Sequence, residues 1–395
     1  MAQLLIIFTL IFSSTVMANP VVGKDAIKEH GDLVFDRYHF TNPSNKKLLK
    51  ESIQSKKRPW SGWWFPSRDR EMFDMGNIIS PLEAYDEMVE FIKNYHGNGI
   101  RYRSSVLKPL YNRWSLDQAN KYFGIMDDFA SRPNGPRNSV EFEEKYVYAY
   151  NEDNWDGVCE GIAFASILED EPTQCREFRA NDGKKVILTP FHQKALLAKK
   201  YDFVSQGVKY YGNKFVNEPW NTNIAGPEHD YSDIKPDQMH KLLHHYMKDR
   251  GQNIIIDYDA SYPVWNVTVY GYDSFIYDEG NGVLSVKTRL YYSDPFDRES
   301  LLGEPGDYKL YATGTVEEFI ELYYELEYIE KRGKYIITGS RWTEGPGLKS
   351  YIHHPDYIIV PEPTKVVPRS AGDVISPEVV DFMLNDLKVV PCPGE

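Results

Sequence analysis

Residues 155–170 read WDGVCEGIAFASILED, and this stretch decides both the expected fold and the expected chemistry. An Asp-Gly pair precedes a short apolar run, so the pattern predicts a buried helix that begins near Cys159. Small residues recur along the run and would let the helix approach its neighbours closely; they are Gly161, Ala163 and Ala165. We therefore expect this helix to lie in the core, with Cys159 at its first turn.

A cysteine at the first turn of a helix is a candidate nucleophile. The unpaired N–H groups and the positive end of the helix dipole stabilise a thiolate there and lower the pKa of the thiol. The same N–H groups are placed to stabilise an oxyanion, as acyl transfer requires. An unreactive core cysteine is the alternative interpretation of Cys159.

Helical patterns flank this stretch on both sides. Apolar residues recur at helical spacing in 81–95, a proline opens the helical pattern of 190–201, and a glycine ends that of 236–251. Runs rich in Val, Ile, Thr and Tyr then predict antiparallel strands at 253–259, 264–277, 282–294 and 307–316. Helices that precede strands indicate an α+β fold, and the proline-rich residues 361–370 are typical of a linker or a wrapping arm.

The composition excludes several classes of protein. Hydrophobic residues make up 42% and aromatic residues 14% of the 395 residues, which is too much for a disordered chain. The 58 acidic residues exceed the 45 basic ones and give a formal charge of -13. This charge argues against a nucleic acid or an anionic membrane as the partner.

The N-terminus has the pattern of a secretory signal. Residues 4–12, LLIIFTLIF, form an apolar run too short to span a bilayer, and Val16 and Ala18 suit the positions before a signal peptidase cleavage site. No later stretch is long and apolar enough to span a membrane. We therefore expect a protein without a membrane span that is secreted, to the periplasm or the exterior, after residues 1–18 are removed.

The three cysteines are too few for a scaffold built on disulfides. In an exported protein, a bridge between Cys175 and Cys392 would tie the C-terminal tail to the body and leave Cys159 unbridged. Three reduced thiols are the alternative.

Several segments together resemble one family. Residues 264–277, VWNVTVYGYDSFIY, are similar to the elicitor-peptide region, V-W-N-Q-P-V, of the secreted transglutaminases of plant-pathogenic oomycetes and their marine bacterial relatives. Val267-Thr268 replaces the Gln-Pro pair of that region, so recognition by elicitor receptors does not follow. The segments PWSGWWFPS (59–67), WDGVCEG (155–161) and FHQKALLAKKYD (191–202) also resemble the family, in blocks that extend from about residue 59 to residue 295.

The resemblance implies a papain-like cysteine enzyme that transfers a glutamine acyl group to a lysine amine, with proteins bearing Gln and Lys as substrates. Cys159 takes the place of the nucleophile. The family's Phe-His pair before an apolar run resembles Met239-His240, so His240 is the leading candidate for the base, with Asp257 to orient its ring. Residues around the nucleophile and in the elicitor-like strand are assigned to substrate binding, namely Trp155, Trp265 and Asn266.

Alternatives remain open for these roles. His229 or the pair His353 and His354 could supply the base, and Asp259 or Asn266 the orienting group. The family's metal-dependent activity implies calcium, but the sequence has no EF-hand spacing, and we assign no metal ligands. A cysteine peptidase or a glutamine deamidase on the same core, and a non-catalytic secreted effector, are the alternative functions.

The expected organisation has four parts. A signal peptide (1–18) and an N-terminal helical and aromatic extension (19–140) precede the catalytic core (141–310), and a C-terminal extension (311–395) follows it. In the core, the nucleophile helix is expected to pack on an antiparallel sheet, as the papain-like resemblance implies.

Overall fold

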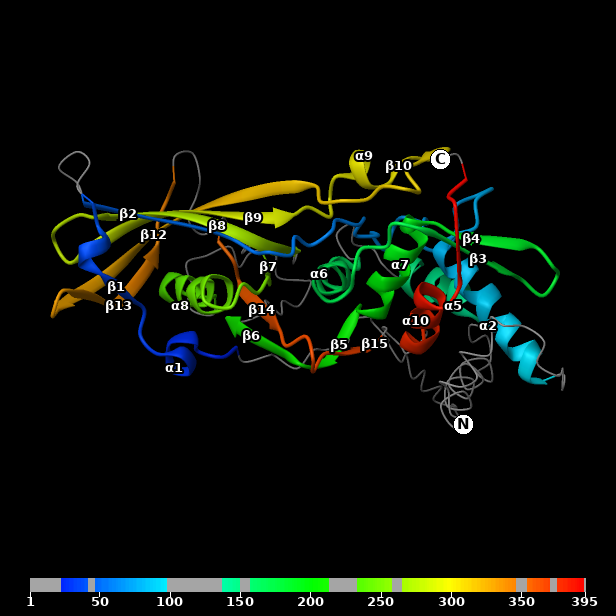
Figure 1. Cartoon of the computed structure of the whole chain (residues 1–395), viewed down its shortest axis with the longest axis horizontal. Helices are drawn as coiled ribbons and strands as arrows, with labels where there is room; N and C mark the ends of the chain where they lie inside the picture. The colour runs from blue at the N-terminus through cyan, green and yellow to red at the C-terminus, as the bar shows by residue number, and fades with distance from the viewer. Residues whose placement is uncertain are drawn as a thin grey trace, which may run out of the picture.

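The computed structural model describes residues 23–41, 47–97, 137–149, 157–212, 233–257, 265–345, 354–369 and 375–393. Figure 1 shows an elongated molecule, with a large sheet toward one end and most of the helices toward the other. The helix that begins at Cys159, α6 (Cys159–Leu168), lies between these two parts. It is therefore placed where the sheet and the helices meet.

In the described residues, nine strands form one sheet in the order β1-β13-β12-β9-β8-β7-β14-β6, with β2 also paired to β8. All of these pairs are antiparallel. The bounds are β1 (Val34–Asp36), β2 (Lys47–Gln54), β6 (Val208–Gly212), β7 (Ile254–Asp257), β8 (Asn266–Asp278), β9 (Val283–Ser293), β12 (Glu317–Lys331), β13 (Lys334–Trp342) and β14 (Tyr357–Pro361).

Strand β8 has two different neighbours along one of its edges. Residues 266–269 pair with β7, and residues 271–278 pair with β2, while β9 follows the other edge over most of its length. An added Cβ at Gly271, between the two pairings, would lie 3.0 Å from the carbonyl oxygen of Ile53. One edge of β8 thereby changes its neighbour from β7 to β2 near Gly271.

Two hydrophobic cores lie on opposite faces of the β7, β8 and β14 region. Ile255, Tyr357 and Ile359 belong to the core that contains α6, whereas Ile254, Ile256 and Ile358 belong to the other core. Side chains of successive strand residues point to opposite faces, so this alternation assigns one core to each face. The second core contains α8 (Pro236–Leu242), which continues as a wider π-type helix, η4 (Leu243–Lys248). Figure 1 shows α8 and α6 on either side of β14.

Close packing of α6 depends on its small residues. Helix α6 packs against α7 (Pro190–Lys200) and against β8. A Cβ on Gly161 would lie only 2.2 Å from the carbonyl oxygen of Ala198 in α7. The close approach expected from the sequence is therefore confirmed.

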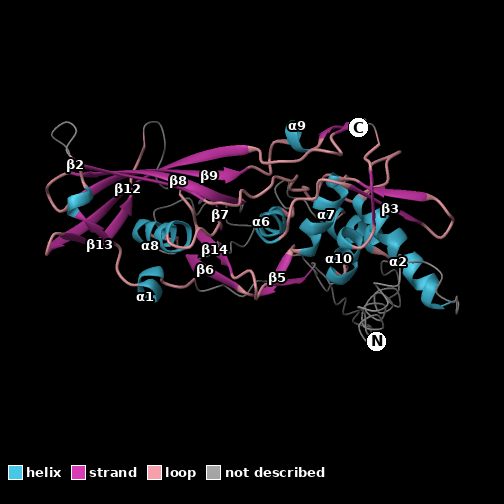
Figure 2. Ribbon diagram, viewed as in Figure 1, coloured by secondary structure: helices cyan, strands magenta, loops and turns pink. Residues whose placement is uncertain are grey.

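The remaining helices gather mainly at the opposite end from the large sheet (Figure 2). Their bounds are α2 (Pro81–Gly97), α5 (Ser139–Phe142), η2 (Glu143–Tyr148) and α10 (Pro377–Asn385), while α1 (Ala26–His30) and η1 (Arg37–His39) lie with the sheet and α9 (Arg298–Leu301) precedes a small hairpin. Three short strands form a second sheet at the helical end: β3 (Cys175–Arg179), β4 (Lys185–Leu188) and β16 (Lys388–Val390).

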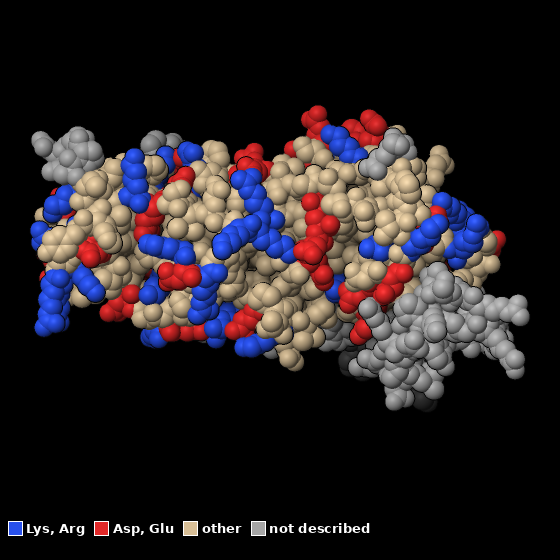
Figure 3. Space-filling model, viewed as in Figure 1, with Lys and Arg blue, Asp and Glu red and all other residues tan. Residues whose placement is uncertain are grey.

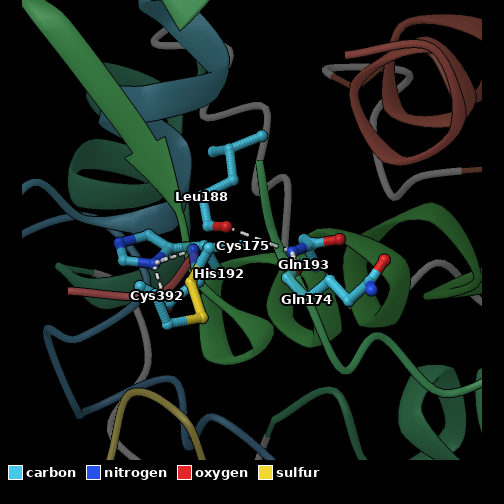
Figure 4. Close-up of a disulfide and its surroundings, with 7 residues drawn as sticks. Gln174, Cys175, Leu188, His192, Gln193 and Cys392 are labelled. Carbon is cyan, nitrogen blue, oxygen red and sulfur yellow. Dashed lines mark hydrogen bonds between the residues drawn. A yellow bond between two sulfur atoms is a disulfide. The ribbon is translucent and has the colours of Figure 1, made fainter. Parts of the chain in front are cut away.

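A disulfide closes this second sheet. Cys175 of β3 and Cys392, which follows β16, are bridged, with their Cα atoms 5.2 Å apart (Figure 4). Next to the bridge, the amide of Gln193 donates hydrogen bonds to the carbonyl oxygens of Gln174 and Leu188, at 2.7 and 3.1 Å. Of the two alternatives that the sequence left open, the structure has the bridge that ties the C-terminal tail to the body, and Cys159 is not in a disulfide.

The four expected helices agree with α2, α6, α7 and α8 with η4, and three of the four expected strands agree with β7, β8 and β9. The expected strand at 307–316 is wrong, because only Asp307–Tyr308 is extended there, as β11 beside β10 (Gly303–Glu304). Of the residues 361–370 expected to form a linker or a wrapping arm, Pro361 ends β14 within the large sheet, and Val367–Arg369 forms β15, which pairs with β5 (Phe203–Gln206).

The expected parts of the chain share one sheet. Strand β2 comes from the expected N-terminal extension and β12 to β14 from the expected C-terminal extension. The proposed signal peptide lies outside the described residues. In the part of the chain that the structure describes, no helix is long and apolar enough to cross a membrane. Basic and acidic side chains are interspersed on the face drawn in Figure 3.

Candidate active site

The backbone before Cys159 is fixed by the tryptophan-rich segment. The N–H of Val158 donates a hydrogen bond to the carbonyl oxygen of Trp64 at 2.9 Å, and Gly157 forms a β-bridge with Pro66. A Cβ on Gly157 would lie 2.7 Å from the Trp64 ring, so this close approach requires glycine. The tryptophans of this segment are themselves buried, namely Trp60, Trp63 and Trp64. The segment is thus a packing element that positions the start of α6.

Three strands supply polar side chains to the face of the sheet that α6 covers. Asp257 ends β7 and pairs in register with Asn266, the first residue of β8. The hydroxyl of Tyr357, the first residue of β14, donates a hydrogen bond to Oδ1 of Asn266 at 2.9 Å. The backbone N–H of Trp265 donates to Oδ1 of Asp257 at 2.7 Å. These contacts hold the ends of three strands in one arrangement.

Tyr357 connects this polar group to the nucleophile candidate. It lies in the same core as Cys159 and interacts electrostatically with Asp257, Glu160 and Cys159. Burial, together with the charges of Asp257 and Glu160, raises the pKa of Tyr357 well above its ordinary value of 10.0. Its hydroxyl therefore stays protonated near neutral pH and acts as a donor.

Glu160 extends the polar group along α6. The hydroxyl of Tyr210 in β6 donates a hydrogen bond to Oε1 of Glu160 at 3.4 Å. Burial, with a further contribution from Glu160, raises the pKa of Tyr210 above its ordinary value. Glu160, the second residue of α6, thus contacts the tyrosine of β6, while Cys159 shares its core with the tyrosine of β14.

The residues expected to bind substrate have different surroundings. Asn266 is 2% exposed and belongs to the polar group just described. Trp265 is half-buried, and its ring lies 5.1 Å from that of Trp64 and 4.9 Å from that of Phe296, measured between centroids. Trp155 and Asp259 lie outside the described residues.

The structure does not bring His240 to Cys159. His240 lies on α8, which packs against α1, β12 and β13, and the sheet separates it from α6. Its Nδ1 lies 2.5 Å from the hydroxyl of Tyr324, and its Nε2 lies 3.3 Å from Oε2 of Glu51. Both ring nitrogens are therefore engaged in the second core, and this placement gives no support to His240 as the base for Cys159. Successive residues of these apolar strands face opposite cores, and the sequence does not show which core a given residue faces.

Five other described histidines lie in contacts of their own. His192 caps α7 and bonds Thr189 and the carbonyl oxygen of Ile79. His354 lies 3.1 Å from Asp233, and His30 stacks on His245. His244 bonds Glu51, and His39 is exposed. His229 and His353, two of the alternatives for the base, lie outside the described residues.

Sequence reasoning did not identify Tyr357, Tyr210 or Glu160. Glu160 directly follows the nucleophile candidate in the WDGVCEG segment, and this position could have identified it as a site residue. The two tyrosines belong to strands far along the chain, within apolar runs that carry no motif. A metal could be held, among the described residues, by Glu51, His240 and His244, whose ligand atoms lie within 4.8 Å of one another.

Comparison with known proteins gives two matches. A model of the transglutaminase elicitor family matches residues 141–374, more than half of the chain. The crystal structure of the GP42 transglutaminase from Phytophthora sojae is similar to this chain with a TM-score of 0.49 and 17% sequence identity, over 85% of this chain and 91% of that one. No protein with a curated description matches the chain.

Proposed function

Because the chain belongs to the transglutaminase elicitor family, we propose that it is a secreted acyltransferase that joins glutamine side chains to primary amines through a thioester on Cys159. The observation that carries this proposal is the position of Cys159 at the first turn of α6, in the same core as Tyr357, whose hydroxyl bonds Asn266 of the Asn266-Asp257 pair. A helix N-terminus favours a thiolate and supplies N–H groups for an oxyanion. This combination supplies the nucleophile and the oxyanion donors of a papain-like acyl transfer, which also needs a base.

The proposed reaction has two steps. In the first, the thiolate sulfur of Cys159 attacks the carboxamide carbon of glutamine, the carbon–nitrogen bond breaks, and nitrogen leaves as ammonia after it accepts a proton. In the second, the nitrogen of a lysine amine attacks the thioester carbon, the carbon–sulfur bond breaks, and the amine loses a proton as the thiolate is restored. Asn266, held by the Tyr357 hydroxyl, would orient the substrate carboxamide.

Amine incorporation tests the proposal. The folded chain is incubated with a glutamine-containing peptide and a fluorescent primary amine, and both the conjugate and free ammonia are measured. We expect conjugate from the wild type and none from Cys159→Ala, with nearly equal melting temperatures for the two proteins. Ammonia without conjugate would instead identify a glutamine deamidase, in which water resolves the thioester.

Thiol reactivity separates an enzyme from a non-catalytic effector. Cys159 is 7% exposed, so its reactivity reports on activation rather than on simple exposure. Labelling of Cys159 by iodoacetamide that is fast and insensitive to pH near neutrality supports an activated thiolate. Labelling no faster than that of free cysteine, together with no conjugate, would remove the enzymatic function.

The proton acceptor is found by substitution of the histidines. His229→Ala and His353→Ala are compared with the wild type in the same assay, with circular dichroism to verify folding. A folded variant that loses conjugate formation identifies the base, and His39→Ala, which changes an exposed imidazole, is the control.

A further inference from the structure

Two histidines and a carboxylate meet in the second core, away from Cys159. Glu51 extends from β2, and His240 and His244 lie one helical turn apart on α8 and η4. Nε2 of His240 and Nε2 of His244 lie 3.3 and 2.7 Å from the same oxygen, Oε2 of Glu51. The three ligand atoms lie within 4.8 Å of one another. We propose that this His240-His244-Glu51 group is a site for a divalent transition metal ion, with Zn²⁺ as the preferred ion.

The residue types and spacings fit such an ion. Zn²⁺ binds imidazole nitrogen and carboxylate oxygen at roughly 2.0–2.2 Å, so neighbouring ligand atoms in a tetrahedron are about 3.3 Å apart. The separation between Nε2 of His240 and Oε2 of Glu51 already has this value, and the contact between His244 and Glu51 must lengthen. The ligand atoms of the two histidines, which lie within 4.8 Å of each other, must come to about the same separation. Two histidines and one carboxylate leave a fourth position for water.

A chain of buried hydroxyls supports the metal-binding tautomer of His240. Nδ1 of His240 contacts the Tyr324 hydroxyl at 2.5 Å, Tyr324 contacts Thr288 at 2.7 Å, and Thr288 contacts Ser274 at 2.7 Å. Each hydroxyl can donate or accept, so the direction of the chain can reverse. With Nδ1–H donating to Tyr324, the lone pair of Nε2 is free for a metal, and His240 stays neutral. Metal-bound histidines usually have such a partner on the other nitrogen.

The open side of the site faces a cavity of about 580 Å³ that is lined in part by Glu51, His244 and Lys248. Nζ of Lys248 lies 2.7 Å from Oε1 of Glu51 and so competes with a cation for this carboxylate. The Lys248 side chain is 40% exposed, which lets it move into solvent when the ion binds. His240, by contrast, is fully buried and gives the site a rigid wall.

The proposal predicts a structural site that joins β2 to the α8–η4 helix. It does not depend on the proposed acyl transfer, because the sheet separates the two sites. Binding of metal is therefore expected to raise the melting temperature and to leave thiol labelling of Cys159 unchanged.

Direct titration tests the site in the full chain. The protein is stripped with a chelator, and Zn²⁺ is added with calorimetric detection; Co²⁺ is added separately, because its visible spectrum reports coordination geometry. We expect one ion per chain, a rise in melting temperature, and a Co²⁺ spectrum of four-coordinate type. A folded wild type that binds no Zn²⁺, or whose Co²⁺ spectrum indicates only water ligands, overturns the proposal without any variant.

Variants identify the ligands. We expect His244→Asn and Glu51→Gln to weaken Zn²⁺ binding at least 100-fold, and Tyr324→Phe to weaken it by roughly 10- to 100-fold, as partners of metal-bound histidines do. Lys248→Met should tighten it, because the competing cation is gone. His245→Asn, which changes the next residue of the helix and removes a ring stacked on His30, is the matched control. If folded His244→Asn binds Zn²⁺ with unchanged affinity, other residues bind the ion and the proposed site is wrong.

Discussion

The hydroxyl of Tyr357 holds the side chain of Asn266 by a hydrogen bond of 2.9 Å, although the two residues are 91 positions apart in the chain. Both are the first residues of their strands, and both side chains lie on the face of the sheet that α6 covers. Since Asn266 is also paired with Asp257, the contact fixes a polar group from three strands on this face.

We expect Tyr357→Phe to lower the rate of amine incorporation by about 10- to 100-fold, because a misplaced positioning group is costly in a preorganised site. The loss of one hydrogen bond should cost only about 1 kcal/mol of unfolding free energy. Turnover and chemical denaturation measure the two effects. The matched control is Tyr211→Phe, since the Tyr211 hydroxyl bonds Tyr246 in the other core. Equal losses of activity in both variants would contradict a local role for Tyr357.

For His240, we expect a loss of stability without a loss of activity. We expect His240→Gln to reduce the unfolding free energy by about 1–3 kcal/mol, because Tyr324 and Glu51 lose a buried partner. Amine incorporation should remain near the wild-type value, since the sheet lies between His240 and Cys159. A variant of unchanged stability with no turnover would restore His240 as the base.

Most elements of this site can be predicted from the sequence, but the way in which they come together cannot. The nucleophile helix, its small residues and the strand that begins at Asn266 follow from local patterns, and so do the helix that carries His240 and the strand that ends at Asp257.

The face that each residue occupies does not follow from these patterns. In the strands IIID and YIIVP, consecutive isoleucines lie between two cores, so these strands lack the polar–apolar alternation that would separate the face of Asp257 and Tyr357 from that of His240. The neighbour relation between β14 and β7 joins residues about 100 positions apart, and the proline-rich flank of β14 instead resembled a linker.

Gly161 tests the packing of α6 on α7. A methyl group there would meet the backbone oxygen of Ala198 at 2.2 Å, and a backbone atom cannot move aside as a side-chain end can. We expect Gly161→Ala to cost at least about 1–3 kcal/mol of unfolding free energy, as overpacking of a core does. Gly339→Ala is the control, because its methyl group would meet the end of the exposed Glu327 side chain. Similar stability of the two variants would mean that α6 and α7 separate without cost.

The Cys175–Cys392 bridge joins residues 217 positions apart. Replacement of Cys392 by Ser should therefore lower the unfolding free energy by about 2–5 kcal/mol, chiefly because the unfolded chain gains freedom. Amine incorporation at moderate temperature should be retained, because the bridge lies at the helical end of the molecule, where Figure 1 shows β3 and the C-terminus. The stabilisation is measured by thermal melts with and without reductant. A wild type whose melting temperature is unchanged by complete reduction of the bridge would contradict the prediction.

The pH dependence of stability has a defined contribution from His192. Burial lowers the pKa of His192 to about 4 from an ordinary 6.5. One ring nitrogen faces the carbonyl oxygen of Ile79 at 2.7 Å and requires a proton, so the other accepts from Thr189 and cannot take one without a clash of donors. Between pH 6.5 and 4 the unfolded chain therefore binds a proton that the folded chain does not.

Linkage gives the sign of this effect. The contribution of neutral His192 to the unfolding free energy is complete above pH 6.5. It falls as the pH decreases toward 4, by up to about 3 kcal/mol. Asp86 acts in the opposite direction, since burial raises its pKa to about 6, so the contribution of His192 is read from the difference between wild type and His192→Asn. Denaturation at pH 7 and pH 4.5 measures it: the gap in stability between the two proteins should shrink at the lower pH. A gap of constant size would mean that His192 is protonated in the folded chain, and that the capping of α7 tolerates the charge.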